Sequence, residues 1–191
     1  MQQEITLSKP QKRLIVLQTR SAHGPYEKNI QFRPELAIYP NDINLPYAEL
    51  TRNNYDNAIR YTDFVIDALY QHFLAETKGA LYFWLTSDHG EMIDHEGRFG
   101  HTILDPVVAE VPIGLFSRAA NPKIMQDFRH ADHLTHWDLT RYILRSVGLE
   151  LIDPNSSPRL RYVSGNGTFA SHGMMILEPK QNGEWSVEKI Q

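Results

Sequence analysis

The sequence predicts an α/β fold in which a mostly parallel central sheet is flanked by helices. Two observations predict it: short apolar runs typical of buried strands alternate with helical periodicity, and polar residues follow the strands where they end. The chain has 191 residues, enough to bury one sizeable core, and its 41% hydrophobic content is typical of a globular protein. We therefore expect one domain over residues 1–191.

The first half of the chain is expected to contain two strands and one helix. The apolar run at 13–19 predicts a buried strand, whereas four prolines in 20–52 predict an irregular segment. Apolar residues recur at helical spacing over 53–76 and include Ile59, which predicts an amphipathic helix with one buried face. The run at 80–86 predicts the second strand.

The second half continues the alternation. Residues 111–117 predict a strand and 135–147 a helix, with Thr135 as N-cap and Gly148 as the C-terminal stop. Short strands are expected near the C-terminus, and an Asn-Gly pair between the last two predicts a hairpin turn. Their ranges are 159–164, 172–177 and 185–190, with the turn at 180–184.

Composition excludes several classes of function. The net charge is −4 and the chain has no basic run, so nucleic-acid binding is not expected. It has no cysteine, which excludes disulfides and thiolate chemistry. The longest apolar runs, 14–17 and 80–85, are too short to span a bilayer, and the N-terminus lacks the apolar segment of a targeting signal.

The segment 81–101 carries the clearest candidate site. The apolar run ends directly in Ser-Asp-His-Gly-Glu, which places Asp88 and His89 side by side after a strand. A carboxylate and an imidazole at the carboxyl edge of a sheet suit Zn²⁺ or a similar divalent ion such as Mn²⁺. The alternative is a strand that ends in a polar turn, with Asp88 capping the turn and His89 solvated.

The first predicted strand is followed by a similar arrangement. His23 comes just after it, before a Gly-Pro turn, so it would meet Asp88 and His89 at one edge if the two strands are neighbours. Lys28 and Arg33 in the same loop are minor candidates for contacts to anionic oxygens, against the alternative of plain solvation.

A rival metal site is possible near the second helix. His130, His133 and His136 are spaced at i, i+3 and i+6, with Asp132 between them. On a single helix, positions i and i+6 point in different directions, so three-point coordination would need a bend. The alternative is a segment that only leads into the helix.

The chain resembles the C-terminal half of the sulfatase-type catalytic domain of lipid A phosphoethanolamine transferases, in the alkaline phosphatase superfamily. The resemblance covers most of residues 13–165, leaving 166–191 as C-terminal strands. It is carried by an ordered set of segments: LQTRSAHGPY, YDNAIRYTDFVIDAL, TSDHGE, FGHTILDP, VPIGLFS and HWDLTRYILRSVGL.

The resemblance implies roles for individual residues. Asp88 and His89 match the pair that ligates the catalytic zinc, and His23 and His101 match histidines that bind the phosphoryl group or a second metal. Glu91 is expected to support this loop as an outer partner that orients His89. The implied chemistry moves phosphoethanolamine from phosphatidylethanolamine, through a covalent enzyme intermediate, to an acceptor.

The chain also departs from that family. The family's nucleophile is a threonine at a helix N-terminus upstream of this region, with a glutamate ligand further upstream, and neither motif occurs before His23. Thr19 and Thr86 do not occupy the nucleophile's setting. We therefore expect a partial catalytic domain, incomplete at its N-terminal side, with no catalytic nucleophile of its own and no activity alone.

The resemblance also implies partners and a location. The intact enzyme would use a phosphatidylethanolamine donor and a lipid A, lipopolysaccharide or envelope-glycan acceptor, on the periplasmic face of the bacterial inner membrane. Two alternatives remain: a sulfatase or phosphodiesterase-type hydrolase of the same superfamily, and a non-catalytic relic that keeps a weak metal site. Upstream membrane-spanning helices and a threonine-bearing motif would favour the transferase.

Overall fold

A computed structural model describes residues 12–152, 161–164, 173–180 and 184–190 of the chain. Its helices are α1 (Glu27–Ile30), the 3₁₀ helix η1 (Pro34–Leu36), α2 (Tyr47–Glu76), α3 (Pro106–Ala109), α4 (Pro122–Arg129) and α5 (His136–Ser146). Its strands are β1 (Leu81–Thr86), β2 (Met92–His95), β3 (Arg98–Gly100), β4 (Ile113–Arg118), β5 (Arg161–Ser164), β6 (Met174–Pro179) and β7 (Trp185–Ile190).

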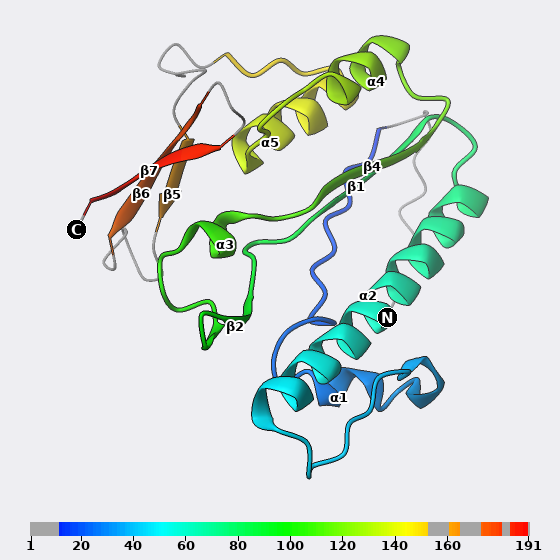
Figure 1. Cartoon of the computed structure of the whole chain (residues 1–191). Coiled ribbons are helices and arrows are strands. Elements are labelled where there is room, and N and C mark those ends of the chain that lie inside the picture. Colours follow the sequence, from blue (N-terminus) through cyan, green and yellow to red (C-terminus); the bar gives the residue numbers. More distant parts are fainter. Residues whose placement is uncertain (1–11, 153–160, 165–172, 181–183, 191) are drawn as a thin grey trace, which may run out of the picture.

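A two-stranded ribbon of β1 and β4 forms the middle of the molecule (Figure 1). Side chains alternate across a strand, so Phe83 and Trp84 point to opposite faces. Phe83 packs against Tyr70 and Phe73 of α2, whereas Trp84 packs against Phe128 of α4 and Tyr142 of α5. The expectation that helices flank the central strands is confirmed.

The expected parallel arrangement is wrong for the described strands. β1 and β4 are antiparallel, with Thr86 opposite Ile113 and Leu81 opposite Arg118. A parallel partner needs a crossover that returns the chain to the starting end of the strand. Here the connection through β2, β3 and α3 stays at the end where β1 finishes, so β4 must run back. The other ladders are antiparallel as well.

The buried strand expected at 13–19 is also not observed. The segment is extended, but it belongs to no ladder among the described residues, and Val16 is 81% exposed and Leu14 62% exposed. The apolar run predicted burial because strands in parallel sheets are covered on both faces. That prediction fails because β1 pairs with β4 and no described strand pairs with 13–19.

The long helix is confirmed, and it begins at Tyr47 rather than 53, directly after Pro46. Its fully buried residues are Asn57 and Ala58, while Ile59 on the expected apolar face is 42% exposed. The Asn57 side chain explains this orientation: its Oδ1 accepts from the backbone N–H groups of Ile38 and Tyr39. The side-chain amide of Asn57 thus faces the loop that precedes α2 and fixes that loop against the helix.

The second predicted helix is confirmed as α5. Thr135 and Asp138 form a capping box, in which the Thr135 hydroxyl accepts from the Asp138 N–H and the Asp138 carboxylate accepts from the Thr135 N–H. Gly148 follows the helix with a φ of +84°, a conformation that favours glycine. Both ends of α5 were therefore readable from the sequence.

The predicted C-terminal strands form a separate three-stranded sheet of β5, β6 and β7. The expected turn between β6 and β7 falls partly on 181–183, outside the described residues, and its ends are joined by the hydrogen bond from Lys180 N to Glu184 O (2.8 Å). In Figure 1 this sheet lies beside α5.

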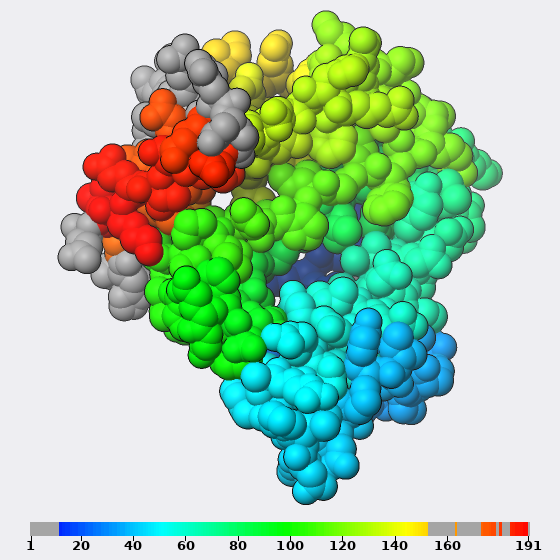
Figure 2. Space-filling view, in the orientation of Figure 1, coloured from blue at the N-terminus to red at the C-terminus, as the bar shows by residue number. Residues whose placement is uncertain are grey.

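Burial among the described residues is scattered over several small clusters. Buried apolar side chains include Met92 of β2, Leu139 of α5 and Met175 of β6, which belong to different parts of the chain. Figure 2 shows a hollow between α2 and the segment that carries β2 to β4. None of the helices described here combines the length and apolar character needed to span a membrane.

Candidate metal centre

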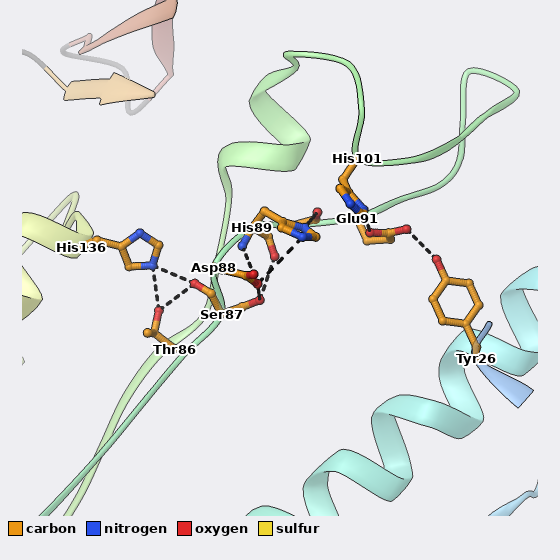
Figure 3. A network of polar contacts seen from close by, with 9 residues as sticks. Tyr26, Thr86, Ser87, Asp88, His89, Glu91, His101 and His136 are labelled. Atoms are coloured by element: carbon orange, nitrogen blue, oxygen red, sulfur yellow. Dashed lines mark hydrogen bonds and ion pairs between the residues drawn. The ribbon is translucent and has the colours of Figure 1, made fainter. Parts of the chain in front are cut away.

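Asp88 and His89 lie side by side just after the end of β1, as the sequence predicted (Figure 3). The Nδ1 atom of His89 lies 2.8 Å from the carbonyl oxygen of Gly90, which assigns the ring proton to Nδ1. Nε2 then carries the free lone pair, and it lies 3.9 Å from Oδ1 of Asp88. One imidazole nitrogen and one carboxylate oxygen thus face each other.

Within the described part of the chain, the carboxylate of Asp88 makes hydrogen bonds only with its two neighbours in the sequence and remains exposed to solvent. Its Oδ1 accepts from the His89 N–H at 3.2 Å and lies 3.5 Å from the Ser87 hydroxyl, and its side chain is 77% exposed. The Ser87 hydroxyl donates to the carbonyl of His89 at 2.8 Å. These contacts fold residues 87–89 into a tight turn that presents the carboxylate to solvent.

Glu91 and His101 form the opposite side of the site. Nδ1 of His101 donates to Oε2 of Glu91 at 2.7 Å, so the Nε2 lone pair of His101 is available to a metal or to a proton. The rings of His89 and His101 stack with their centroids 3.9 Å apart. The loop between β1 and α3 therefore brings two imidazoles together although they are twelve residues apart.

Glu91 supports a different histidine from the one expected. It was expected to orient His89, but its carboxylate accepts from Nδ1 of His101 and from the hydroxyl of Tyr26, which donates to Oε1 at 2.6 Å. Burial, and secondarily the Glu91 carboxylate, raise the pKa of Tyr26, so its hydroxyl keeps its proton and its role as donor. A Tyr–Glu–His chain results.

The donor set fits a divalent ion such as Zn²⁺. Ligand atoms of His89, Glu91 and His101 all lie within 4.8 Å of one another. Ligands bound at about 2.0 Å around a tetrahedral ion are about 3.3 Å apart, so small side-chain movements close the site. Imidazole nitrogens and carboxylate oxygens are suitable zinc ligands, and His89 is common to this group and to the Asp88 pair.

His23 does not join this cluster. Its side chain is exposed, and its Nδ1 lies 2.6 Å from the carbonyl of Gly24. No hydrogen bond or ion pair links it to Asp88, His89 or His101 among the described residues. The loop does reach the site, but through Tyr26, three residues further on. In the sequence, the only sign of this contact was that a tyrosine follows the Gly-Pro pair directly after His23.

Lys28 and Arg33 make no contact with the site in the described structure. The Arg33 guanidinium lies over the ring of Phe64 at 4.2 Å and pairs with Glu35. Lys28 is exposed within α1. The structure therefore does not support a role for Lys28 or Arg33 in binding anionic oxygens at this site.

The three histidines of the rival site diverge. His130 is exposed at the end of α4, the His133 ring packs against Trp185 at 4.6 Å, and His136 turns toward the end of β1. Among the described residues, the group of three or more potential ligands that lie close together is His89, Glu91 and His101. The rival reading was therefore not supported where the chain is described.

The turn at Gly90 is fixed by close backbone packing. Its N–H donates to the carbonyl of Val108 at 2.7 Å, and a Cβ atom at this position would lie 2.4 Å from the carbonyl oxygen of Val107. Asp105 caps α3 beneath it, accepting from the Val107 N–H at 3.1 Å. Only glycine allows this approach between the metal loop and α3.

Asp105 also ties α3 to the β2–β3 hairpin. It pairs with Arg98 at 3.2 Å and lies 4.0 Å from Nε2 of His95. Burial pushes the pKa of Asp105 upward, but the Val107 N–H, Arg98 and His95 outweigh it, so the net direction is down. Asp105 is therefore ionised at neutral pH and holds the hairpin that leads to His101.

A family model described as Sulfatase matches residues 1–141, and the chain belongs to the sulfatase family. Membership of this family implies an α/β fold of the alkaline phosphatase type. No curated protein and no solved structure matches the chain. Members of this family depend on a bound metal, which agrees with the group of His89, Glu91 and His101.

Proposed function

We propose that the chain is part of the catalytic domain of a metal-dependent phosphoethanolamine transferase. The observation that carries the proposal is the Asp88–His89 pair at the end of β1, next to a second imidazole that a partly buried Tyr–Glu chain holds. The ordered set of sequence segments that resemble phosphoethanolamine transferases supports this subfamily over other sulfatase-family enzymes.

The residues divide the work by their chemistry. Asp88 and His89 would hold the ion, Zn²⁺ or Mn²⁺, which when bound neutralises charge on phosphoryl oxygens. Glu91 keeps the Nδ1 proton on His101, so its Nε2 points a lone pair or a proton toward the site. His23 is solvent-exposed, and a phosphoryl role for it requires the 20–26 loop to move inward.

The proposed reaction is an exchange of one phosphodiester bond for another. In the first step a bond from phosphorus to an enzyme hydroxyl oxygen forms, the bond from phosphorus to diacylglycerol breaks, and the enzyme's proton goes to the diacylglycerol hydroxyl. In the second step the acceptor oxygen bonds to phosphorus, the bond from phosphorus to the enzyme oxygen breaks, and the acceptor's proton restores the enzyme hydroxyl. Donor and acceptor are then phosphatidylethanolamine and lipid A or an envelope glycan, on the periplasmic face of an inner membrane.

Zinc binding tests the centre itself. We expect calorimetry to give one Zn²⁺ per chain, abolished in His89→Ala, because His89 is common to both groups of donors. Asp88→Asn should weaken binding as well. His72→Ala is the matched control, since His72 lies on α2 and its ring packs against Phe73. Zinc binding that survives His89→Ala would contradict the centre.

Transfer is tested with a fluorescent phosphatidylethanolamine and Zn²⁺. We expect no phosphoethanolamine adduct by intact mass from this chain alone, because none of its threonines matches the nucleophile's motif. A longer protein that joins this chain to an upstream threonine-bearing motif of the family should form the adduct and lose it in Asp88→Ala. Release of free phosphoethanolamine without transfer to a glycan or lipid acceptor would favour the hydrolase alternative instead.

A further inference from the structure

We infer that His136 is a positioning residue that holds the turn carrying Asp88 and His89. Its Nε2 atom lies 2.7 Å from the carbonyl oxygen of Ser87 and 3.2 Å from the hydroxyl of Thr86. The inference deepens the proposed function, since it concerns the same metal centre. It assigns a role to a histidine that sequence reasoning placed in a different, rival site.

The donor at this contact is unambiguous. A carbonyl oxygen only accepts, so the short Nε2 contact to Ser87 requires a proton on Nε2. The Thr86 hydroxyl lies 3.3 Å from the same carbonyl and donates to it as well. Two donors therefore converge on the peptide that joins Ser87 to Asp88, as Figure 3 shows.

The fold places His136 there through two fixed elements. Thr86 lies two residues after Trp84 and so faces the same side of β1. On that side Trp84 packs against Tyr142 of α5, with ring centroids 6.1 Å apart. The Thr135 capping box fixes the first turn of α5, and Leu139, one turn after His136, is 5% exposed. α5 is thereby anchored to β1, with His136 at its start.

The orientation of the Ser87–Asp88 peptide controls the metal ligands. The Asp88 carboxylate follows this peptide directly, and its Oδ1 accepts from the His89 N–H at 3.2 Å. Asp88 itself is exposed and has no partner from another element among the described residues. A hydrogen bond from α5 to the preceding carbonyl is therefore a long-range restraint on this turn at the Asp88 end, while the Gly90–Val108 hydrogen bond restrains the other end.

The test compares two substitutions. His136→Gln keeps an amide N–H donor near the position of Nε2, whereas His136→Leu removes the donor at similar volume. His130→Leu is the matched control, because His130 is an exposed histidine at the end of α4. Circular dichroism checks that each variant folds before the two measurements below.

The first measurement needs no metal. We expect amide hydrogen exchange of His89 to be about fivefold faster in His136→Leu, and unchanged in His136→Gln and His130→Leu. The second is zinc affinity by competition with a chelating dye. Loss of an outer partner typically weakens metal binding by about 10-fold to 100-fold, and we expect this in His136→Leu only.

Unchanged exchange of His89 in a folded His136→Leu protein would overturn the positioning role. Equal losses of zinc affinity in His136→Gln and His136→Leu would also overturn it, because the donor would then be irrelevant. If the wild-type chain bound no zinc, the proposed metal function would fail, and the exchange measurement would still decide the role of His136.

Discussion

The hydroxyl of Tyr26 lies 2.6 Å from Oε1 of Glu91, and this contact joins the N-terminal loop to the metal loop. The two residues are 65 positions apart in the sequence. Glu91 in turn accepts from Nδ1 of His101, so the tyrosine indirectly sets the orientation of an imidazole in the site. Tyr26 is the residue of this centre that the sequence did not identify.

Replacing Tyr26 by phenylalanine should destabilise the fold and loosen the site. The change leaves the partly buried Glu91 carboxylate short of one donor, and we expect the free energy of unfolding to fall by about 1–2 kcal/mol. Urea denaturation measures this. Tyr47→Phe is the control, because Tyr47 also packs edge-on against a ring but is 70% exposed. Equal losses in both variants would contradict the assignment.

Glu91→Gln should release His101. Tyr26 donates to Oε1 and His101 to Oε2, and glutamine replaces one of these oxygens by an NH2 group that cannot accept. We expect a mixture of His101 tautomers by nitrogen-15 NMR without metal, and zinc binding weaker by about 10-fold to 100-fold. An unchanged tautomer together with lost zinc binding would mean that Glu91 acts as a ligand in the group with His89 and His101, and not as the outer partner of His101.

Gly90→Ala should disrupt the metal loop. The added Cβ would lie 2.4 Å from the Val107 carbonyl oxygen and 2.6 Å from that of Glu110, so the backbone must shift. We expect a loss of about 1–3 kcal/mol in unfolding free energy and weaker zinc binding. Gly79→Ala is the matched control, since a Cβ there meets nothing within 4 Å. If Gly90→Ala were as stable as the wild type, the close packing of Gly90 against α3 would be wrong.

Asp105 should give the fold an acid-sensitive component. Its folded pKa lies below the unfolded value of about 3.9, so its contribution is complete above that pH and is lost as the pH falls through the folded pKa. Asp105→Asn keeps the oxygen that caps α3 but loses the charge facing Arg98. We expect it to be about 1 kcal/mol less stable than wild type at pH 7, with the difference shrinking as the pH falls below the unfolded pKa and disappearing below the folded pKa. A pH-independent difference in urea unfolding would contradict this.

The exposed apolar run at 14–17 should promote self-association. Its four apolar side chains are more than half exposed, and its backbone joins no ladder among the described residues, a combination that invites pairing with another chain. We expect sedimentation to show concentration-dependent oligomers that Val16→Lys reduces without lowering the melting temperature. Ile43→Lys, which changes an equally exposed loop residue, should leave association unchanged. If sedimentation showed only monomers of the wild-type chain at all concentrations, association through residues 14–17 would be disproved.

Local elements followed from the sequence because their determinants are local. Periodicity predicted α2, Thr135 and Gly148 marked the two ends of α5, and apolar runs located β1 and β4. Pairing direction did not follow, because an apolar run is buried equally well beside a parallel or an antiparallel neighbour. The run at 13–19 shows the same limit: composition predicts a preference for burial, but only a partner strand satisfies it.

The sequence by itself determined which residues adjoin along the chain, and so it identified Asp88 and His89 as a pair at a strand end. Only the tertiary structure decided which distant side chains meet them. Tyr26 rather than His23 reaches the site, Glu91 supports His101 rather than His89, and His136 holds the Ser87 carbonyl. The physical reason is that hydrogen bonds between elements depend on how the elements pack, and residue spacing carries no record of that packing.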